Sequence, residues 1–208
     1  AAGELPVFRT GVSFVRLDAQ VEDGRKLIAD LGPEDFVIRD EGIERKAVYF
    51  SRASEPVSVL LLLDVSGSMK RYVEEVAAAA KAALAQMHKE DQVAVMVFAR
   101  KTKLRAAFTR DHAEIARELR QAARQDGDVG SATLINSAVI EAAGYIGRVR
   151  PNAGGRRSIL IVTDNNSLVY KTPDGHVLWA LWNGDTVLNA IVTGKGYRPP
   201  PPPPGKAL

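Results

Sequence analysis

Two aspartates and three hydroxyl residues stand at the ends of predicted strands or at the start of a predicted helix. Asp64 follows the apolar run VSVLLLL, and Ser66 and Ser68 come next in DVSGSM. Asp164 ends a second apolar run, RRSILIVTD, and Thr133 opens the helical segment TLINSAVIEAAGYIGRV. Carboxylates and hydroxyls are hard oxygen ligands, which suit Mg²⁺, Mn²⁺ or Ca²⁺ and match Zn²⁺ or Cu²⁺ poorly. These five residues therefore predict a divalent-cation site.

The coordination expected from these residue types leaves room for an outside ligand. Mg²⁺ prefers six oxygens and keeps several waters, so hydroxyls can ligate it directly while carboxylates hold waters, and one position stays open. An alternative is that the same residues only cap helices. Ser66 or Ser68 would then accept backbone N–H groups, and Asp64 would favour the positive helix end. Thr133 by itself would be an ordinary cap. Both interpretations can hold together, because a metal-binding loop also caps its helix.

The elements that must position these residues alternate between strand and helix. The apolar runs before Asp64 and Asp164 are continuous, which suits strands buried on both faces of a mostly parallel sheet. Repeated strand and helix elements predict a doubly wound α/β sheet with right-handed crossovers, whose ligands bind at the carboxyl ends of the strands. Both aspartates are therefore expected at one edge. The predicted strands are 57–63, 91–99, 102–108, 156–164 and 186–194, and the predicted helices are 69–87, 111–123, 133–149 and 176–182.

Three parts of the chain are predicted. Residues 1–55 form a small antiparallel β unit, with strand formers in VSFVRLDAQVE and hairpin turns at Gly24 and Gly42. Residues 56–196 form the α/β domain. Residues 197–208 hold six consecutive prolines and are expected to be an extended linker, with a ligand for a proline-recognising partner as the less favoured alternative.

Composition excludes several classes of function. The 28 basic and 25 acidic residues are spread along the chain without a basic stripe, so nucleic-acid binding is not predicted. The absence of cysteine excludes disulfides, thiolate metal sites and cysteine nucleophiles. No apolar run approaches the roughly 20 residues of a membrane helix, so no membrane span is predicted. The start, AAGELPVF, lacks a basic segment followed by an apolar one, so any secretion signal has been removed or never existed.

The sequence resembles the von Willebrand factor type A domain. DVSGSM matches the Asp-x-Ser-x-Ser signature of that family's metal-ion-dependent adhesion site. Thr133 in SATLINSAV looks like the threonine that a later loop adds to the site. Asp164 in ILIVTDNN looks like the aspartate at a later strand end. The resemblance covers Pro56 to Gly194.

The resemblance implies a divalent-cation-dependent protein-binding or adhesion module that is not an enzyme. Ser66 and Ser68 would ligate the metal directly, and Thr133 directly or through water. Asp64 and Asp164 would mainly hold waters, and an Asp or Glu of a protein partner would complete the coordination. The alternative function is a structural or assembly module without a metal-dependent ligand. The oligomeric state is left open.

The segment before the type A domain resembles one subfamily in particular. LGPEDFVIRDEGIERKAVYF is similar to the pattern that precedes the type A domain in a subfamily common in acidobacteria, whose members are typically exported. This similarity implies an extracytoplasmic location, secreted or periplasmic. The chain departs from the family at Asn165, where a glycine is usual after the second aspartate. The family's further strand and C-terminal helix would lie beyond Leu208 or be absent.

Catalysis is not predicted. A phosphatase of the haloacid dehalogenase type needs a second aspartate two residues after the first, where this chain has Ser66. A serine hydrolase needs Gly-x-Ser-x-Gly, and VSGSM lacks the final glycine. The histidines, His88, His112 and His176, lie in polar stretches and offer no evident general base. A metal-dependent hydrolase is therefore the least favoured alternative.

Two further features are interpreted as packing. The alanine-rich segment of helix 69–87 is expected to allow close approach of a neighbouring element. Trp179 and Trp182 are three residues apart and share a face on a helix. Core packing is their expected role, and an exposed pair would instead be a contact surface.

Overall fold

The structure of this chain is a computed structural model. It describes residues 17, 19–50, 56–122, 127–130, 132–152, 155–167 and 172–193. The chain divides into two compact units, Ala1–Ser54 and Glu55–Leu208. Most of the strand former segment at 12–22 and all of the tail at 197–208 lie outside the described residues.

The first unit contains two antiparallel hairpins, as the sequence predicts. β1 pairs with β2, and β3 pairs with β4. Gly24 and Gly42 occupy the two turns with φ angles of +63° and +82°, a region that glycine enters without steric cost. The elements are β1 (Glu22–Asp23), β2 (Lys26–Leu27), the 3-10 turn η1 (Pro33–Asp35), β3 (Ile38–Asp40) and β4 (Ile43–Arg45).

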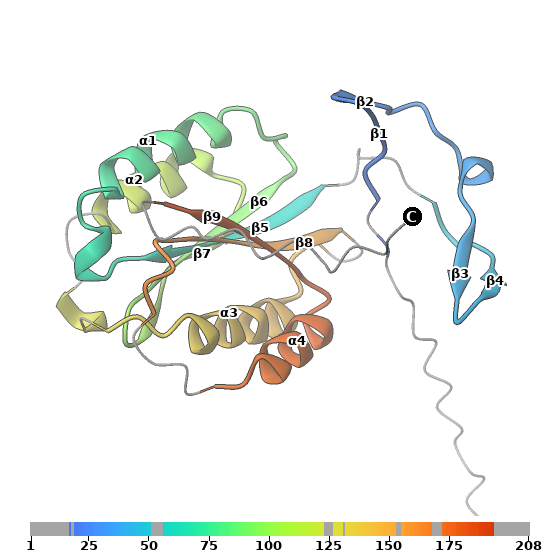
Figure 1. The fold of residues 1–208 in the computed structure, drawn as a ribbon. Coiled ribbons are helices and arrows are strands. Elements are labelled where there is room, and N and C mark those ends of the chain that lie inside the picture. Colours follow the sequence, from blue (N-terminus) through green and yellow to red (C-terminus); the bar gives the residue numbers. More distant parts are fainter. Residues whose placement is uncertain are drawn as a thin grey trace, which may run out of the picture. The chain divides into compact units, whose positions relative to one another are not determined.

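The second unit is built on one sheet of five strands in the order β7-β6-β5-β8-β9 (Figure 1). All neighbours pair parallel except β7, which is antiparallel to β6. The chain runs outward from β5 to β7 and then returns to place β8 on the other side of β5. The strand order therefore reverses between β5 and β8, the place where open α/β sheets bind ligands. The strands are β5 (Val57–Asp64), β6 (Gln92–Phe98), β7 (Thr102–Thr109), β8 (Arg156–Thr163) and β9 (Val187–Val192).

Helices cover both faces of this sheet, which confirms the doubly wound α/β prediction. α1 and α2 lie on one face, and α3 and α4 lie on the other (Figure 1). Leu61 and Leu63 of β5 point into the core under α1 and α2, whereas Leu60 and Leu62 point into the core under α3 and α4. The helical elements are η2 (Gly67–Met69), α1 (Val73–Leu84), α2 (His112–Ala122), η3 (Gly127–Val129), α3 (Ile135–Val149) and α4 (Asp174–Asn183).

Burial on both faces explains the unbroken leucine run of β5. Each of these leucines is at most 8% exposed, and burying one such side chain stabilises the fold by about 1.5–3 kcal/mol. A buried carboxylate also anchors the start of the strand. Asp91 accepts the N–H groups of Val57 and His88, each at 2.8 Å. The last residue of β5, Asp64, is therefore held at the end of a strand fixed along its whole length.

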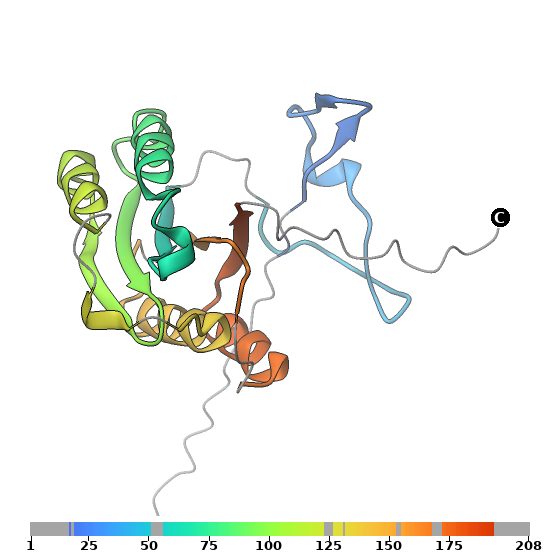
Figure 2. The same cartoon turned by 60° about the vertical axis from the view of Figure 1, so that its left-hand side comes forward.

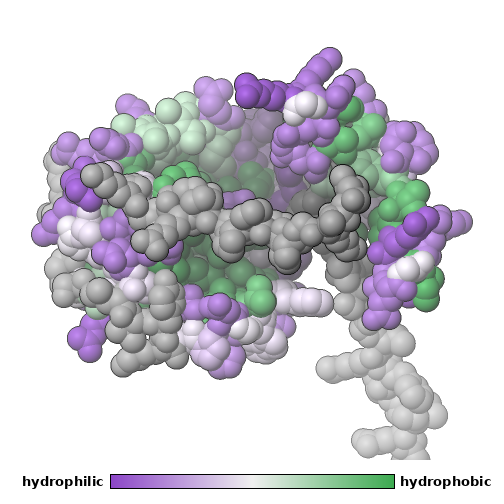
Figure 3. Space-filling view, in the orientation of Figure 1, coloured by the Kyte–Doolittle hydropathy of each residue, from purple (hydrophilic) through white to green (hydrophobic). Residues whose placement is uncertain are grey.

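The helix after β5 is shorter than predicted. The segment expected to be helical from residue 69 begins as the 3-10 turn η2, and α1 starts only at Val73. The alanine-rich side of α1 is also exposed, since Ala78, Ala79, Ala82 and Ala83 face solvent. Figure 3 shows this side of α1 as a pale hydrophobic area at the upper left. The close-packing prediction therefore holds for Ala80, which contacts the core together with the larger Tyr72, Val76 and Leu84, and not for the four exposed alanines.

The two edges of the sheet differ in how they meet solvent. β7 carries Lys103 and Arg105, and its pairing with β6 is irregular. Charged residues and irregular pairing both hinder the addition of a further strand. β9 lies at the opposite edge (Figure 2) and has no charged residue, while its Val187 and Ile191 are 47% and 50% exposed. In the part of the chain that the structure describes, β9 is thus the less protected edge.

The tryptophans lie on the solvent side of α4, so the core-packing prediction was wrong. Trp179 is 71% exposed and Trp182 is 79% exposed. Val177, Ala180 and Leu181 take the packed side instead, and Gly184 lies against Gly147 of α3. Close approach of α4 to α3 therefore leaves the larger aromatic residues outside. Among the described helices, none has the length and apolar character needed to cross a membrane.

Candidate metal centre

The loop after β5 brings one carboxylate and two hydroxyls together. Asp64 is 2% exposed, and its Oδ1 accepts the N–H of Ser66 at 2.9 Å. The Oγ atoms of Ser66 and Ser68 are 3.2 Å apart. Ser66 is buried and Ser68 is exposed. One hydroxyl of the pair therefore lies in the buried part of the loop, and the other lies on its solvent-exposed side.

Helix capping does not account for these hydroxyls. Ser66 is the N-cap residue of η2, but its side chain makes no capping hydrogen bond. Tyr72 precedes α1, and Leu134 rather than Thr133 is the N-cap residue of α3. The capping alternative is therefore wrong for Thr133 and is not supported for Ser66, which leaves both hydroxyls without that structural role.

The second carboxylate follows β8, the neighbour of β5. Asp164 is 8% exposed, and its Oδ1 accepts the N–H of Asn166 at 3.0 Å. Asn165 between them has a φ of +56°, in the left-handed region. Glycine enters this region freely, and asparagine is among the few other residues that tolerate it. The departure from the family's glycine therefore keeps the backbone geometry that the turn requires.

Thr133 reaches the same edge through the segment before α3. It is 3% exposed. The next residue, Leu134, donates its N–H to the carbonyl oxygen of Ala99 just after β6, at 3.0 Å. The hydroxyl of Ser167 in the Asp164 loop donates to the carbonyl oxygen of Thr133, also at 3.0 Å. The loops that carry Thr133 and Asp164 are therefore hydrogen-bonded to each other.

The electrostatics of the site favour a cation. Burial raises the pKa of the Asp64 carboxyl, hydrogen bonds from Thr163 and Ser66 lower it, and the nearby charge of Asp164 raises it further. Among the described residues, neither carboxylate forms an ion pair with Lys, Arg or His. The described residues also contain no group of three or more His, Cys, Asp or Glu placed to hold a metal. Any metal here would accordingly depend on hydroxyl and water ligands as well as the two carboxylates, and this all-oxygen set fits a hard divalent cation.

Two residues that tie the loops together were not predicted from the sequence. Thr163, the last residue of β8, donates its hydroxyl proton to Oδ2 of Asp64 at 2.6 Å. Ser167 contributes the bond to Thr133 described above. One signal was available for Thr163. It follows Ile159 and Ile161 at alternate positions, which places it on the same face of the sheet as Leu62 and Asp64.

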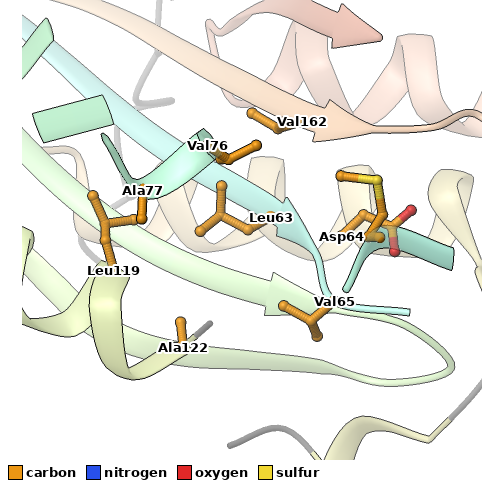
Figure 4. A pocket seen from close by; sticks show the side chains of 9 residues that line it. Leu63, Asp64, Val65, Val76, Ala77, Leu119, Ala122 and Val162 are labelled. Carbon is orange, nitrogen blue, oxygen red and sulfur yellow. The ribbon is translucent and has the colours of Figure 1, made fainter. Parts of the chain in front are cut away.

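Apolar side chains form the surroundings of Asp64 on the α1 side. Leu63, Val76, Leu119 and Val162 line a small, largely apolar pocket on this side, and Asp64 is also one of its lining residues (Figure 4). The carboxylate itself is buried, and among the described residues it accepts hydrogen bonds from the N–H of Ser66 and the hydroxyl of Thr163. The two bonds from Ser66 and Thr163 therefore decide how Asp64 is oriented.

The fold and these residues define a class of protein. It is a doubly wound α/β domain whose loops carry oxygen ligands at the point where the strand order reverses. The sequence pattern of the von Willebrand factor type A domain matches residues 59–166, which is just over half of the chain. The chain therefore belongs to this family. No curated protein shows significant similarity to it.

Solved structures with the same fold are distant in sequence. An aerotolerance-related membrane protein from Bacteroides fragilis is 21% identical, with a TM-score of 0.55 over 65% of this chain and 67% of that one. Manganese-loaded TRAP protein from Plasmodium vivax is 15% identical, with a TM-score of 0.55 over 68% and 59%. Proximal thread matrix protein 1 from the mussel byssus, with zinc in its MIDAS motif, is 15% identical, with a TM-score of 0.58 over 68% and 39%. At these identities the likeness establishes the fold alone.

Proposed function

We propose that residues 56–196 form a protein-binding module that depends on a divalent cation. The observation that carries the proposal is the meeting of two buried carboxylates, Asp64 and Asp164, where the strand order reverses. No cationic side chain among the described residues pairs with either of them. A divalent cation would offset their repulsion and would use the adjacent hydroxyls as ligands.

Each of the five residues has a proposed role. Ser66 and Ser68 would ligate the cation directly, and Thr133 directly or through a water. Asp64 and Asp164 would hold coordinated waters, since each carboxylate oxygen has lone pairs beyond those used in the bonds described above. Mg²⁺ is the proposed ion, and Mn²⁺ or Ca²⁺ would accept the same oxygen donors. The bound ion supplies a positive charge that the site neutralises only in part.

The proposed ligand is an Asp or Glu carboxylate on a protein partner. Ser68 is the exposed member of the site, so an outside group would approach from its side. A carboxylate that completes the coordination would link partner binding directly to the metal. Among solved structures of this fold, TRAP protein was crystallised with manganese and the byssus protein with zinc in its MIDAS motif, which supports metal binding as a property to test here.

Calorimetric titration with MgCl₂ and MnCl₂ tests the metal site. Wild-type protein is expected to bind both ions, and Asp64→Ala is expected to bind neither. Asp91→Asn is the matched control, because it alters a second buried carboxyl group at the other end of β5 and should bind like wild type. Equal heats for wild type and Asp64→Ala would refute the metal site. Capture of partners with Mg²⁺ and with EDTA then tests whether binding depends on the ion.

The alternative of a structural or assembly module has one observation in its favour. Trp179 and Trp182 are exposed on α4, and the nearby edge strand β9 carries no charge. Exposed aromatic residues are common anchors of protein interfaces. Partner capture that is unchanged in EDTA and lost in a Trp179→Ala, Trp182→Ala double variant would favour this alternative over the metal-dependent function.

We also propose that the protein is not an enzyme and acts outside the cytoplasm. The His112 ring bonds to the carbonyl oxygen of Asp91, just before β6 and so at the edge opposite the candidate site. Its position offers the site no general base. Turnover of a phosphoester or ester substrate that Asp64→Ala abolishes would contradict the non-enzymatic role. The extracytoplasmic location rests on the resemblance to exported proteins, and fractionation of the native cells tests it.

A further inference from the structure

A single hydroxyl group connects the two central strands at the candidate site. Thr163 is 3% exposed and lies at the end of β8, and Asp64 lies at the end of β5. The Oγ1 atom of Thr163 is 2.6 Å from Oδ2 of Asp64, a length typical of a hydroxyl that donates to an ionised carboxylate. The bond spans 99 residues of sequence. It therefore fixes the end of one strand relative to the end of the other.

The direction of this hydrogen bond is set by a third group. The N–H of Asn165 donates to the same Oγ1 atom of Thr163 at 3.1 Å. A hydroxyl has one proton to donate. With an N–H already directed at its oxygen, Thr163 turns that proton toward Asp64. The chain of bonds thus runs from the Asn165 amide through Thr163 to the carboxylate.

Both oxygens of the Asp64 carboxylate are therefore fixed by hydrogen bonds. Oδ1 accepts the N–H of Ser66, and Oδ2 accepts the Thr163 hydroxyl. A carboxylate bonded at both oxygens cannot rotate about its Cβ–Cγ bond without breaking one of the two. Each oxygen still has a lone pair free for a water molecule. The orientation of those lone pairs is thereby determined by Thr163 as well as by the loop that carries Ser66.

The segment that begins at Thr163 also reaches the third loop. Asp164 follows Thr163 directly, and three residues later the hydroxyl of Ser167 bonds to the carbonyl oxygen of Thr133. One short stretch after β8 therefore supplies a site carboxylate and bonds to both other loops of the site.

We infer that Thr163 is a positioning residue for the metal centre: its hydroxyl orients the Asp64 carboxylate before the cation arrives, and Ser167 does the same for the Thr133 loop. This inference rests on the proposed metal-binding function. Groups that orient metal ligands or the holders of ligand waters commonly change metal affinity by 10–100-fold when they are removed. Neither residue was among the five predicted from the sequence.

The test compares two substitutions at one position. Thr163→Val removes the hydroxyl and keeps the branched shape of the side chain, whereas Thr163→Ser keeps the hydroxyl. Mn²⁺ affinity is measured by calorimetry on the full chain, and thermal unfolding of the metal-free protein is followed by far-UV circular dichroism. Thr163→Val is expected to bind Mn²⁺ about 10–100-fold more weakly than wild type. Thr163→Ser is expected to restore affinity close to that of wild type.

Ser58→Ala is the matched control. Ser58 is fully buried in β5, as Asp64 is, but its hydroxyl has no hydrogen-bond partner in the described part of the chain. Removal of this hydroxyl should leave Mn²⁺ affinity unchanged. Ser167→Ala is the second test variant, so that the inference is still tested if Thr163→Val does not fold. It is expected to weaken Mn²⁺ binding without a matching loss in unfolding temperature.

The outcomes separate this inference from the proposed function. If wild type binds Mn²⁺, Asp64→Ala does not, and Thr163→Val binds like wild type, the metal site stands and the inference is overturned. Equal weakening by Thr163→Ser and Thr163→Val would also overturn it, because packing and not the hydroxyl would then control affinity. Unchanged affinity in Ser167→Ala would overturn the role given to Ser167. If wild type binds no Mn²⁺, the proposed function and this inference fall together.

Discussion

Replacement of Asp64 by asparagine should remove a pH dependence of stability and should weaken metal binding. In the metal-free protein the Asp64 carboxylate is buried, and burial is the largest of the influences that raise its pKa. A carboxyl group whose pKa is raised by folding contributes stability that is fully present below its unfolded pKa and is lost as the pH rises through its folded pKa. The contribution of Asp64 to the stability of metal-free wild type should therefore fall as the pH rises from the acidic range toward neutrality. Asp64→Asn lacks this pH dependence, although its amide N–H group faces one of the two donors and costs a hydrogen bond.

A bound cation adds a second difference between the two proteins. At a metal concentration 100 times its dissociation constant, wild type gains about 2.7 kcal/mol of unfolding free energy. If the substitution weakens binding about 100-fold, the same concentration adds only about 0.4 kcal/mol to the variant. The difference of about 2.3 kcal/mol corresponds to a gap of about 5–9 °C between the two metal-induced shifts in melting temperature for a chain of this size.

Circular dichroism melts of both proteins, in EDTA and in MgCl₂ or MnCl₂, measure these quantities. A series from pH 4 to pH 7 in EDTA adds the pH dependence, which only wild type should show from this group. Asp91→Asn should retain the metal-induced shift of wild type and serves as the control. The reasoning is refuted if Asp64→Asn shows the full wild-type shift with metal. It is refuted equally if the stabilities of wild type and variant in EDTA change alike between pH 4 and pH 7.

Three further predictions concern stability measured by chemical denaturation without metal. Asp91→Ala removes the acceptor of two 2.8 Å hydrogen bonds from Val57 and His88. It should lower the free energy of unfolding by about 3 kcal/mol or more, and Asp91→Asn should lower it less. No measurable loss in Asp91→Ala would contradict the anchoring of β5. Arg150 ends α3 with a φ of +46°, so Arg150→Gly should raise the unfolding free energy by up to about 1 kcal/mol, and a decrease would argue against strain there. Trp182→Ala removes a side chain that is 79% exposed and should change stability by less than about 0.5 kcal/mol; a cost above 2 kcal/mol would show that α4 packs against something in solution.

The parts of the fold that sequence patterns predicted are those where burial leaves a strong signal. β5 and β8 are covered on both faces, so their sequences are apolar without interruption and their type was evident. The start of α1 was predicted too early. The residues after Ser66 have good helix formers nearby, but the chain first makes the 3-10 turn η2, which carries Ser68. Local propensity could not reveal this turn, because its geometry follows from the loop that holds the hydroxyls.

The residue types of the candidate site were predictable from the sequence, but the residues that position them were not. Asp64 and Asp164 each follow an apolar run, and the rule that ligands bind at the carboxyl ends of strands brought them to one edge. Thr163 was missed because threonine is an ordinary strand residue. Its contact with Asp64 exists only because β5 and β8 are neighbours in the sheet. A single sequence does not state which strands are adjacent. The acidobacterial subfamily and the metal ligands stay predictions.

The core-packing prediction for the two tryptophans was wrong for a different reason. Large aromatic residues at helical spacing usually indicate a core face. In α4 the packed face consists of Val177, Ala180 and Leu181, and at its end Gly184 lies against Gly147 of α3. Ala180 on the same face is buried. The largest side chains are then left on the opposite face.

Their exposure makes the protein's own fluorescence unusual. The chain contains two tryptophans, and both stand on the solvent side of α4. Their indole rings are hydrated in the folded state already, so emission should shift little when the domain unfolds. Intrinsic fluorescence would thus be a poor measure of folding. A blue shift on mixing with another molecule would instead report that something has covered α4, independently of events at the metal centre.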